Sequence, residues 1–110
     1  MAEVDTTRAS DVFQTFLLDA PQFSQAWGEM VYHLSQASAL DMKMQALAYL
    51  AVLAALRLDG GIAFHVHHAK QLGATRDEII SAIMVGLPAA GHVVTQVLPA
   101  ALAAYDDAEL

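Results

Sequence analysis

Cysteine is absent from this chain of 110 residues. Disulfides, thiolate nucleophiles and cysteine-ligated zinc or iron–sulfur centres are therefore excluded within it. A chain without disulfides fits a reducing compartment, and we expect a cytoplasmic protein. The first residues carry neither a basic segment nor an apolar run, so the sequence predicts no signal peptide.

Charged residues are also scarce, at 15% of the chain against about 25% in a typical globular domain. The five basic residues do not cluster, which argues against nucleic acid as a partner. The net charge is −7, and most of the excess acid lies near the two ends of the chain, at Glu3, Asp5, Asp11, Asp19, Asp106, Asp107 and Glu109. This acidity is typical of solvated termini.

Apolar residues, by contrast, make up 56% of the sequence. A single domain of this size buries only about two-thirds of its unfolded surface, so the excess needs a membrane or a subunit interface to cover it. A membrane span is not expected, because the long uncharged stretch 79–105 is interrupted by Gly86, Pro88, Gly91 and Pro99. The composition therefore predicts a homo-oligomer.

The chain shows no sustained alternation of polar and apolar residues, and Ala, Leu and Met are frequent, which predicts an all-α fold. We expect a flexible tail over 1–9 and one domain of five to six helices over 10–110. The third helix is apolar nearly all round and should be the buried central one. The expected helices span about 10–18, 19–36, 41–57, 62–72, 76–87 and 91–105. Ser10 or Asp11 could cap the first, Asp41 starts the third, and Pro99 could bend the last.

Histidines gather in the segment 58–78, which holds three of the five within four residues, at His65, His67 and His68. Two glycines, Gly60 and Gly61, precede them. Downstream, Gly73 suits the position after a helix end, and the segment 75–78 (Thr-Arg-Asp-Glu) has the pattern of a capping box.

The sequence Ile-Ala-Phe-His at 62–65 and the turn Gly-Ala-Thr-Arg-Asp-Glu-Ile at 73–79 resemble the carboxymuconolactone decarboxylase and alkylhydroperoxidase D-like superfamily. The resemblance is good over about 43–90. It implies a small all-helical fold that assembles into dimers, trimers or hexamers. Redox members of that family carry Glu, eleven residues, Cys-x-x-Cys, three residues and His.

Transferred residue by residue, that redox motif places its histidine at His65. The two cysteine positions fall on Leu58 and Gly61, and the glutamate position falls on Ala46. Peroxide reduction in this family needs a thiolate, which neither Leu58 nor Gly61 can supply. The resemblance therefore implies the scaffold without its redox centre, and we expect no cofactor.

His65 is the first candidate catalytic residue, as a general acid or base; a histidine hydrogen-bonded within an interface is the alternative. His68 lies three residues on and shares its helix face, and His92 at the start of the last helix is a third candidate. A metal site on this pair would need a third ligand that only the fold could bring.

We expect a substrate pocket lined by Asp59, Gly61 and Trp27, although the Asp59–Gly61 segment also reads as a plain turn. Two functions stay open. One is an oligomer that binds a small organic acid or lactone. The family's decarboxylase branch implies that any catalysis would be proton transfer of a cofactor-free lyase type. The other is a non-catalytic structural oligomer.

The purified protein should show no thiol-dependent reduction of hydroperoxides, because no sulfur nucleophile is present. A coupled assay with a reduced dithiol partner measures this. Robust turnover above the rate without protein would contradict the motif comparison.

Overall fold

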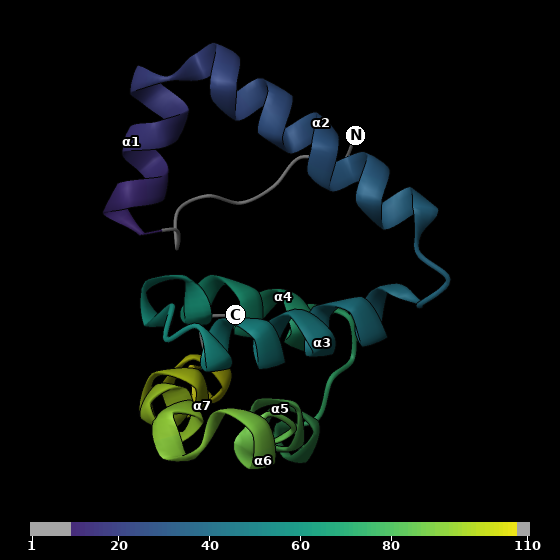
Figure 1. Ribbon diagram of the computed structural model, residues 1–110, viewed down its shortest axis with the longest axis vertical. Helices are drawn as coiled ribbons and strands as arrows, with labels where there is room; N and C mark the ends of the chain where they lie inside the picture. The colour runs from purple at the N-terminus through teal and green to yellow at the C-terminus, as the bar shows by residue number, and fades with distance from the viewer. Residues whose placement is uncertain (1–9, 108–110) are drawn as a thin grey trace.

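The computed structural model describes residues 10–107, and within them every regular element is helical (Figure 1). Six α-helices have nine or more residues, which confirms the predicted all-α fold. In chain order the elements are α1 (Asp11–Asp19), α2 (Pro21–Ala37), α3 (Met42–Ala55), the 3₁₀ turn η1 (Asp59–Gly61), α4 (Ile62–Gln71), α5 (Arg76–Met84), the single turn α6 (Leu87–Ala90), the 3₁₀ segment η2 (His92–Val97) and α7 (Leu98–Asp106). The predicted tail 1–9 lies outside the described residues.

The core belongs to the second half of the chain. Helix α3 packs against α4 and α5, and α7 closes the bundle by packing against the same two helices. The largest side chains without any exposed surface come from these helices and from η2: Leu50, Ile62, Val66, Ile79, Ile83, Val94 and Val97. Their burial supplies most of the favourable free energy of folding.

Helix starts follow the capping residues that the sequence predicts. The Ser10 hydroxyl accepts a hydrogen bond from the Phe13 amide at 3.2 Å, and the Asp41 carboxylate accepts one from the Met44 amide at 2.8 Å. Each bond satisfies an amide that the first helical turn leaves without a backbone partner.

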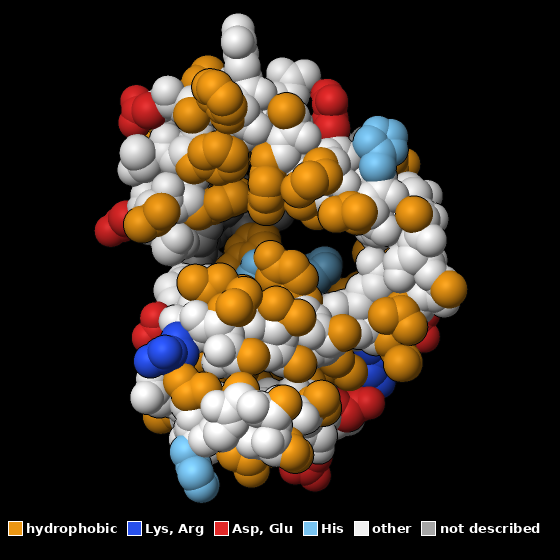
Figure 2. Space-filling model, viewed as in Figure 1, with side chains coloured by type: hydrophobic (Ala, Val, Ile, Leu, Met, Phe, Trp, Pro, Cys, Tyr) orange, Lys and Arg blue, Asp and Glu red, His pale blue; other side chains and the backbone are white. Residues whose placement is uncertain are grey.

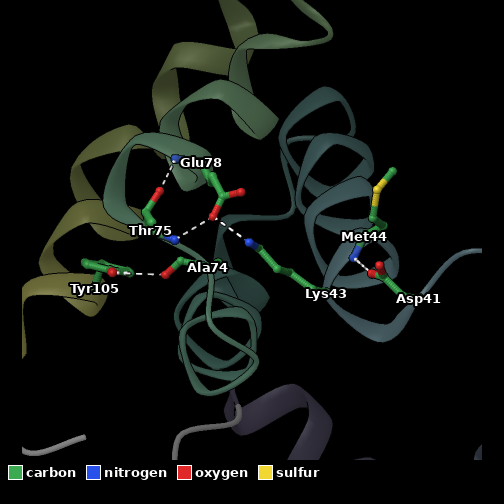
Figure 3. A network of polar contacts seen from close by, with 7 residues as sticks. All are labelled: Asp41, Lys43, Met44, Ala74, Thr75, Glu78 and Tyr105. Carbon is green, nitrogen blue, oxygen red and sulfur yellow. Dashed lines mark hydrogen bonds and ion pairs between the residues drawn. The ribbon is translucent and has the colours of Figure 1, made fainter.

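The junction between α4 and α5 is tied to both neighbouring helices (Figure 3). Thr75 and Glu78 form the predicted capping box: the Thr75 hydroxyl accepts from the Glu78 amide at 3.1 Å, and the Glu78 carboxylate accepts from the Thr75 amide at 2.9 Å. The same carboxylate lies 2.9 Å from the Lys43 ammonium on α3, and the Tyr105 hydroxyl on α7 donates to the Ala74 carbonyl at 3.0 Å. The capping box therefore also anchors α5 to the bundle.

The last predicted helix differs from the structure. Instead of one helix over 91–105, the chain forms α6, then η2, and begins α7 only at Leu98. Gly91 adopts a φ of 81°, which ends α6, and the β-branched run 93–95 that follows is a poor helix former. Pro99 lies in the first turn of α7, where its missing amide costs nothing, so it starts that helix rather than bending it. Similarly, α5 ends at Met84 rather than near Leu87.

The third helix is central, as predicted, but in the single chain only one side of it is buried. Leu50 and Ala54 have no exposed surface, but Tyr49 is 45%, Val52 53% and Leu56 62% exposed. The last three share one side of α3 and its C-cap. We call them the α3 face. The bundle covers only the opposite side of this helix, which leaves an apolar surface bare.

Helices α1 and α2 form an arch that stands away from the bundle (Figure 1). The only helix against which α2 packs extensively is α1, and neither contributes a buried apolar residue. A wide opening separates the arch from α3, with apolar side chains along both of its edges (Figure 2). None of the described helices combines the length and the apolar character that a membrane span requires.

Replacing Thr75 by alanine should lower the free energy of unfolding by ~1 kcal/mol, because the Glu78 amide loses its cap. Denaturant unfolding measures the difference. Thr75→Ser keeps the hydroxyl and serves as the control. Equal losses in both variants would show that the cap does not stabilise α5.

Candidate functional site

His65 and Tyr49 form a stacked pair beside the opening. His65 belongs to the second turn of α4 and Tyr49 to the middle of α3; their ring centroids are 4.4 Å apart, with 33° between the planes. Phe64 meets the same imidazole edge-on at 5.1 Å. Figure 2 shows histidine side chains inside the opening, at the level of α4. Two aromatic rings therefore flank the imidazole, which is only partly buried.

The orientation of α4 about its own axis places His65 at the edge of the core. Ile62, Val66 and Ala69 have no exposed surface, and together they define the side of α4 that faces the core. His65 lies on the flank of that face and is only partly buried. The apolar spacing of α4 thus determines which edge of the helix presents a titratable group.

The glycines before α4 leave space next to His65. Gly61 has a φ of −99°, and neither it nor Gly60 adopts a positive φ, so the backbone here does not require glycine. A Cβ added at Gly61 would lie 3.8 Å from Cδ2 of His65, an ordinary contact. The missing side chain leaves the edge of the imidazole open at the position that holds the second cysteine in redox relatives.

His65 is neutral at pH 7. Burial, and then the positive charge of nearby His68, lowers the pKa of His65 from its usual 6.5 to about 4. A neutral imidazole offers one hydrogen-bond donor and one acceptor but no charge. His65 can therefore orient a polar group by hydrogen bonding but brings no charge of its own to an anion.

The other predicted site residues are distributed around this pair. His68 is exposed on the same helix, one turn further on, and Asp59 is exposed at the start of η1. Trp27 lies in the arch, edge-on to Phe13 and Phe16 at 5.4 and 6.1 Å. His92 is exposed at the start of η2.

Metal ligation finds no support in the part of the chain that the structure describes. There, no three His, Asp or Glu side chains come close enough to share an ion. His65 and His68 thus lack the third ligand that the metal hypothesis needs.

A second hollow lies between α3 and α5 and presents few polar groups. Its lining is almost entirely apolar and includes Met44, Ala48 and Val85. Glu78 is the charged residue at its rim, and its carboxylate is already bound to the Thr75 amide and to Lys43. This groove suits packing rather than catalysis.

Comparison with known families identifies the scaffold. The model of the carboxymuconolactone decarboxylase family matches residues 21–106, and the chain belongs to this family. It is a member without cysteine, and therefore without the Cys-x-x-Cys centre of the redox branch.

Among solved structures, the fold is similar to the apo form of lpg0406, a carboxymuconolactone decarboxylase family protein from Legionella pneumophila. The TM-score is 0.74 at 23% sequence identity, over 86% of this chain and 84% of that one. At this identity the likeness establishes the fold alone. No curated protein matches the chain.

No signal in the sequence indicated the contact between Tyr49 and His65. The two residues are sixteen positions apart on different helices, so no local spacing reports their stacking. The crossing of α3 and α4 creates the pair.

An NMR titration should give His65 a pKa of about 4. His68→Gln should raise the pKa of His65, since it removes the neighbouring charge. The unfolded chain binds the His65 proton more readily, so stability should fall as pH drops from 6.5 toward 4, and His65→Phe should weaken that fall. A His65 pKa above 6 would contradict the burial described here.

Proposed function

We propose that the protein binds an uncharged small molecule, such as a lactone, against the Tyr49–His65 pair. The carrying observation is the stacked, neutral imidazole at an apolar opening, with space beside it at Gly61. The aromatic rings offer a flat apolar surface, and the imidazole nitrogens offer a hydrogen bond that fixes the ligand's orientation.

The charges in the structure favour a lactone over a free organic acid. His65 carries no charge at pH 7, because its pKa is lowered to about 4. Of the four cationic side chains that the structure describes, three bind groups elsewhere: Lys43 pairs with Glu78, Lys70 with the carbonyl and ring of Tyr105, and Arg76 with Asp106. None of these three could pair with a carboxylate at His65 without giving up its present partner, and neutral His65 offers no opposite charge itself.

Binding, rather than fast catalysis, is the primary role that the electrostatics support. A general base works best with a pKa near the operating pH, and a group of pKa about 4 is a weak base. If the protein is an enzyme, proton transfer through His65 is the chemistry this site offers, without thiol or cofactor. His68 works against base catalysis at His65, because its charge contributes to the lowered pKa.

A structural oligomer remains the second candidate. The apolar surface of the arch and of the α3 face favours it, since monomers rarely leave such extended apolar patches uncovered. Ligand binding at His65 distinguishes the two functions.

A matched pair of ligands tests the proposal: a γ-lactone and the hydroxycarboxylate formed when its ring opens. The lactone should shift the NMR signals of the Tyr49 ring and the hydroxycarboxylate should not, since the neutral His65 offers a carboxylate no opposite charge. His65→Phe should abolish the response, whereas His92→Gln on the exposed η2 segment should keep it. Equal shifts with both ligands, or none with a series of lactones, would contradict the proposal.

A further inference from the structure

Helices α3 and α4 end with the same pair of backbone hydrogen bonds. At the end of α3, the Leu58 amide donates to the Leu53 carbonyl at 2.9 Å. The Arg57 amide donates to the Ala54 carbonyl at 3.2 Å. Together these bonds close the helix around one residue in the left-handed conformation, which here is Arg57 with a φ of 59°.

The end of α4 repeats this geometry with glycine in the left-handed position. The Ala74 amide donates to the Ala69 carbonyl at 3.0 Å. The Gly73 amide donates to the Lys70 carbonyl, also at 3.0 Å, and Gly73 has a φ of 96°. Glycine adopts this conformation without strain, whereas a residue with a side chain does not. Among the described residues, Arg57 is the one non-glycine residue with a positive φ, so the chain carries an arginine where the backbone favours glycine.

No contact inside the described part of the chain compensates for this strain. The side chains of Lys43, Lys70 and Arg76 each bind a partner. Among the described residues, the Arg57 guanidinium has neither a hydrogen bond nor an ion pair, not even with Asp59 two residues further on. Strained residues that persist in a fold cluster at sites that contact ligands or partners. The strain at Arg57 therefore indicates a contact outside the chain.

The surroundings of Arg57 are those of a protein–protein contact. Leu56 is 62% and Leu58 is 50% exposed, so two apolar side chains flank the guanidinium in solvent. The centre of an interface between proteins is apolar, and arginine is enriched there. The matching turn after α4 has no such flanks, because Leu72 is partly buried and Ala74 is buried.

The charge of the chain restricts what can bind at Arg57. The net charge is −7, which repels a polyanion. Nucleic acids and anionic membranes are bound by clusters of basic residues, and Arg57 stands alone. A single guanidinium matches a single carboxylate, to which it can donate two parallel hydrogen bonds. The charge pattern therefore favours one acidic side chain in otherwise apolar surroundings.

We propose that Arg57 is a docking residue for another protein and binds one Asp or Glu carboxylate within an apolar segment of that partner. Leu56 and Leu58 pack against the apolar side chains next to the carboxylate. The contact does not depend on the lactone proposed above.

Melting temperatures test whether the arginine is held against strain. Arg57→Gly should raise the melting temperature by roughly 4 °C, because it relieves the left-handed side chain. Arg57→Gln keeps a side chain at the same φ and should gain nothing. Gly73→Arg should melt lower, since a Cβ there meets nothing within 4 Å and only the backbone conformation opposes it. Equal melting of Arg57→Gly and Arg57→Gln, or no loss in Gly73→Arg, would overturn the proposal.

Short random peptides displayed on phage test the docking. Peptides are first depleted on Arg57→Gln, which removes those that bind elsewhere, and are then selected on the wild-type chain. The recovered peptides should share one Asp or Glu between apolar residues. The Arg57→Gly/Gly73→Arg double variant moves the arginine to the matching turn and should recover none of them. Recovery of no peptide on the wild type, or of peptides without an acidic residue, would overturn the proposal.

A double-mutant cycle with a recovered peptide tests the direct contact. Changing the peptide's carboxylate to the amide, or Arg57 to Gln, should each weaken binding about tenfold, and the two changes together should cost no more than either alone. Additive losses would show that the two groups do not meet. Light scattering should give Arg57→Gln the same assembly as the wild type. A changed assembly would show that Arg57 serves a contact between copies of this chain and would also overturn the proposal.

Discussion

The packing of α4 between α3 and α7 determines where the functional groups of this protein lie. Ile62, Val66 and Ala69 have no exposed surface and lock the rotation of α4. Because His65 stands on the flank of that buried face, the imidazole meets Tyr49 on one side and the opening on the other. A different rotation of α4 would either bury this histidine completely or release it to solvent.

The chain has the fold of its family but lacks the thiol groups of the redox branch. The core consists of aliphatic side chains from α3, α4, α5, η2 and α7, so it does not depend on the cysteine positions. Replacing those positions by Leu58 and Gly61 removes the nucleophile and leaves room beside the retained histidine. That histidine has no thiol to deprotonate and is held neutral, which suits binding better than base catalysis.

Local signals made much of the fold predictable. Ser10, Asp41 and the capping box of Thr75 and Glu78 each act within three or four residues, and the structure confirms all of them. The prediction of one continuous last helix was wrong, because Gly91 and the β-branched residues after it interrupt the helix. The family resemblance, carried by residues around His65 and Thr75, anticipated the family that the comparison shows.

The contacts between helices, and the helix sides left exposed, could not be predicted from the spacing of residues in the sequence. The Tyr49–His65 pair depends on how α3 crosses α4, and the bare α3 face depends on which helices cover α3. The excess of apolar residues indicated an uncovered surface but did not say that it lies on the arch and on one side of α3. Trp27, predicted as pocket wall, belongs to an aromatic cluster at the bend of the arch, where α1 and α2 meet.

A crystal structure of the assembled protein grown with a γ-lactone would test the central claim most directly. The account predicts ordered ligand density against the Tyr49 and His65 rings. A structure with no ligand beside His65 would contradict it.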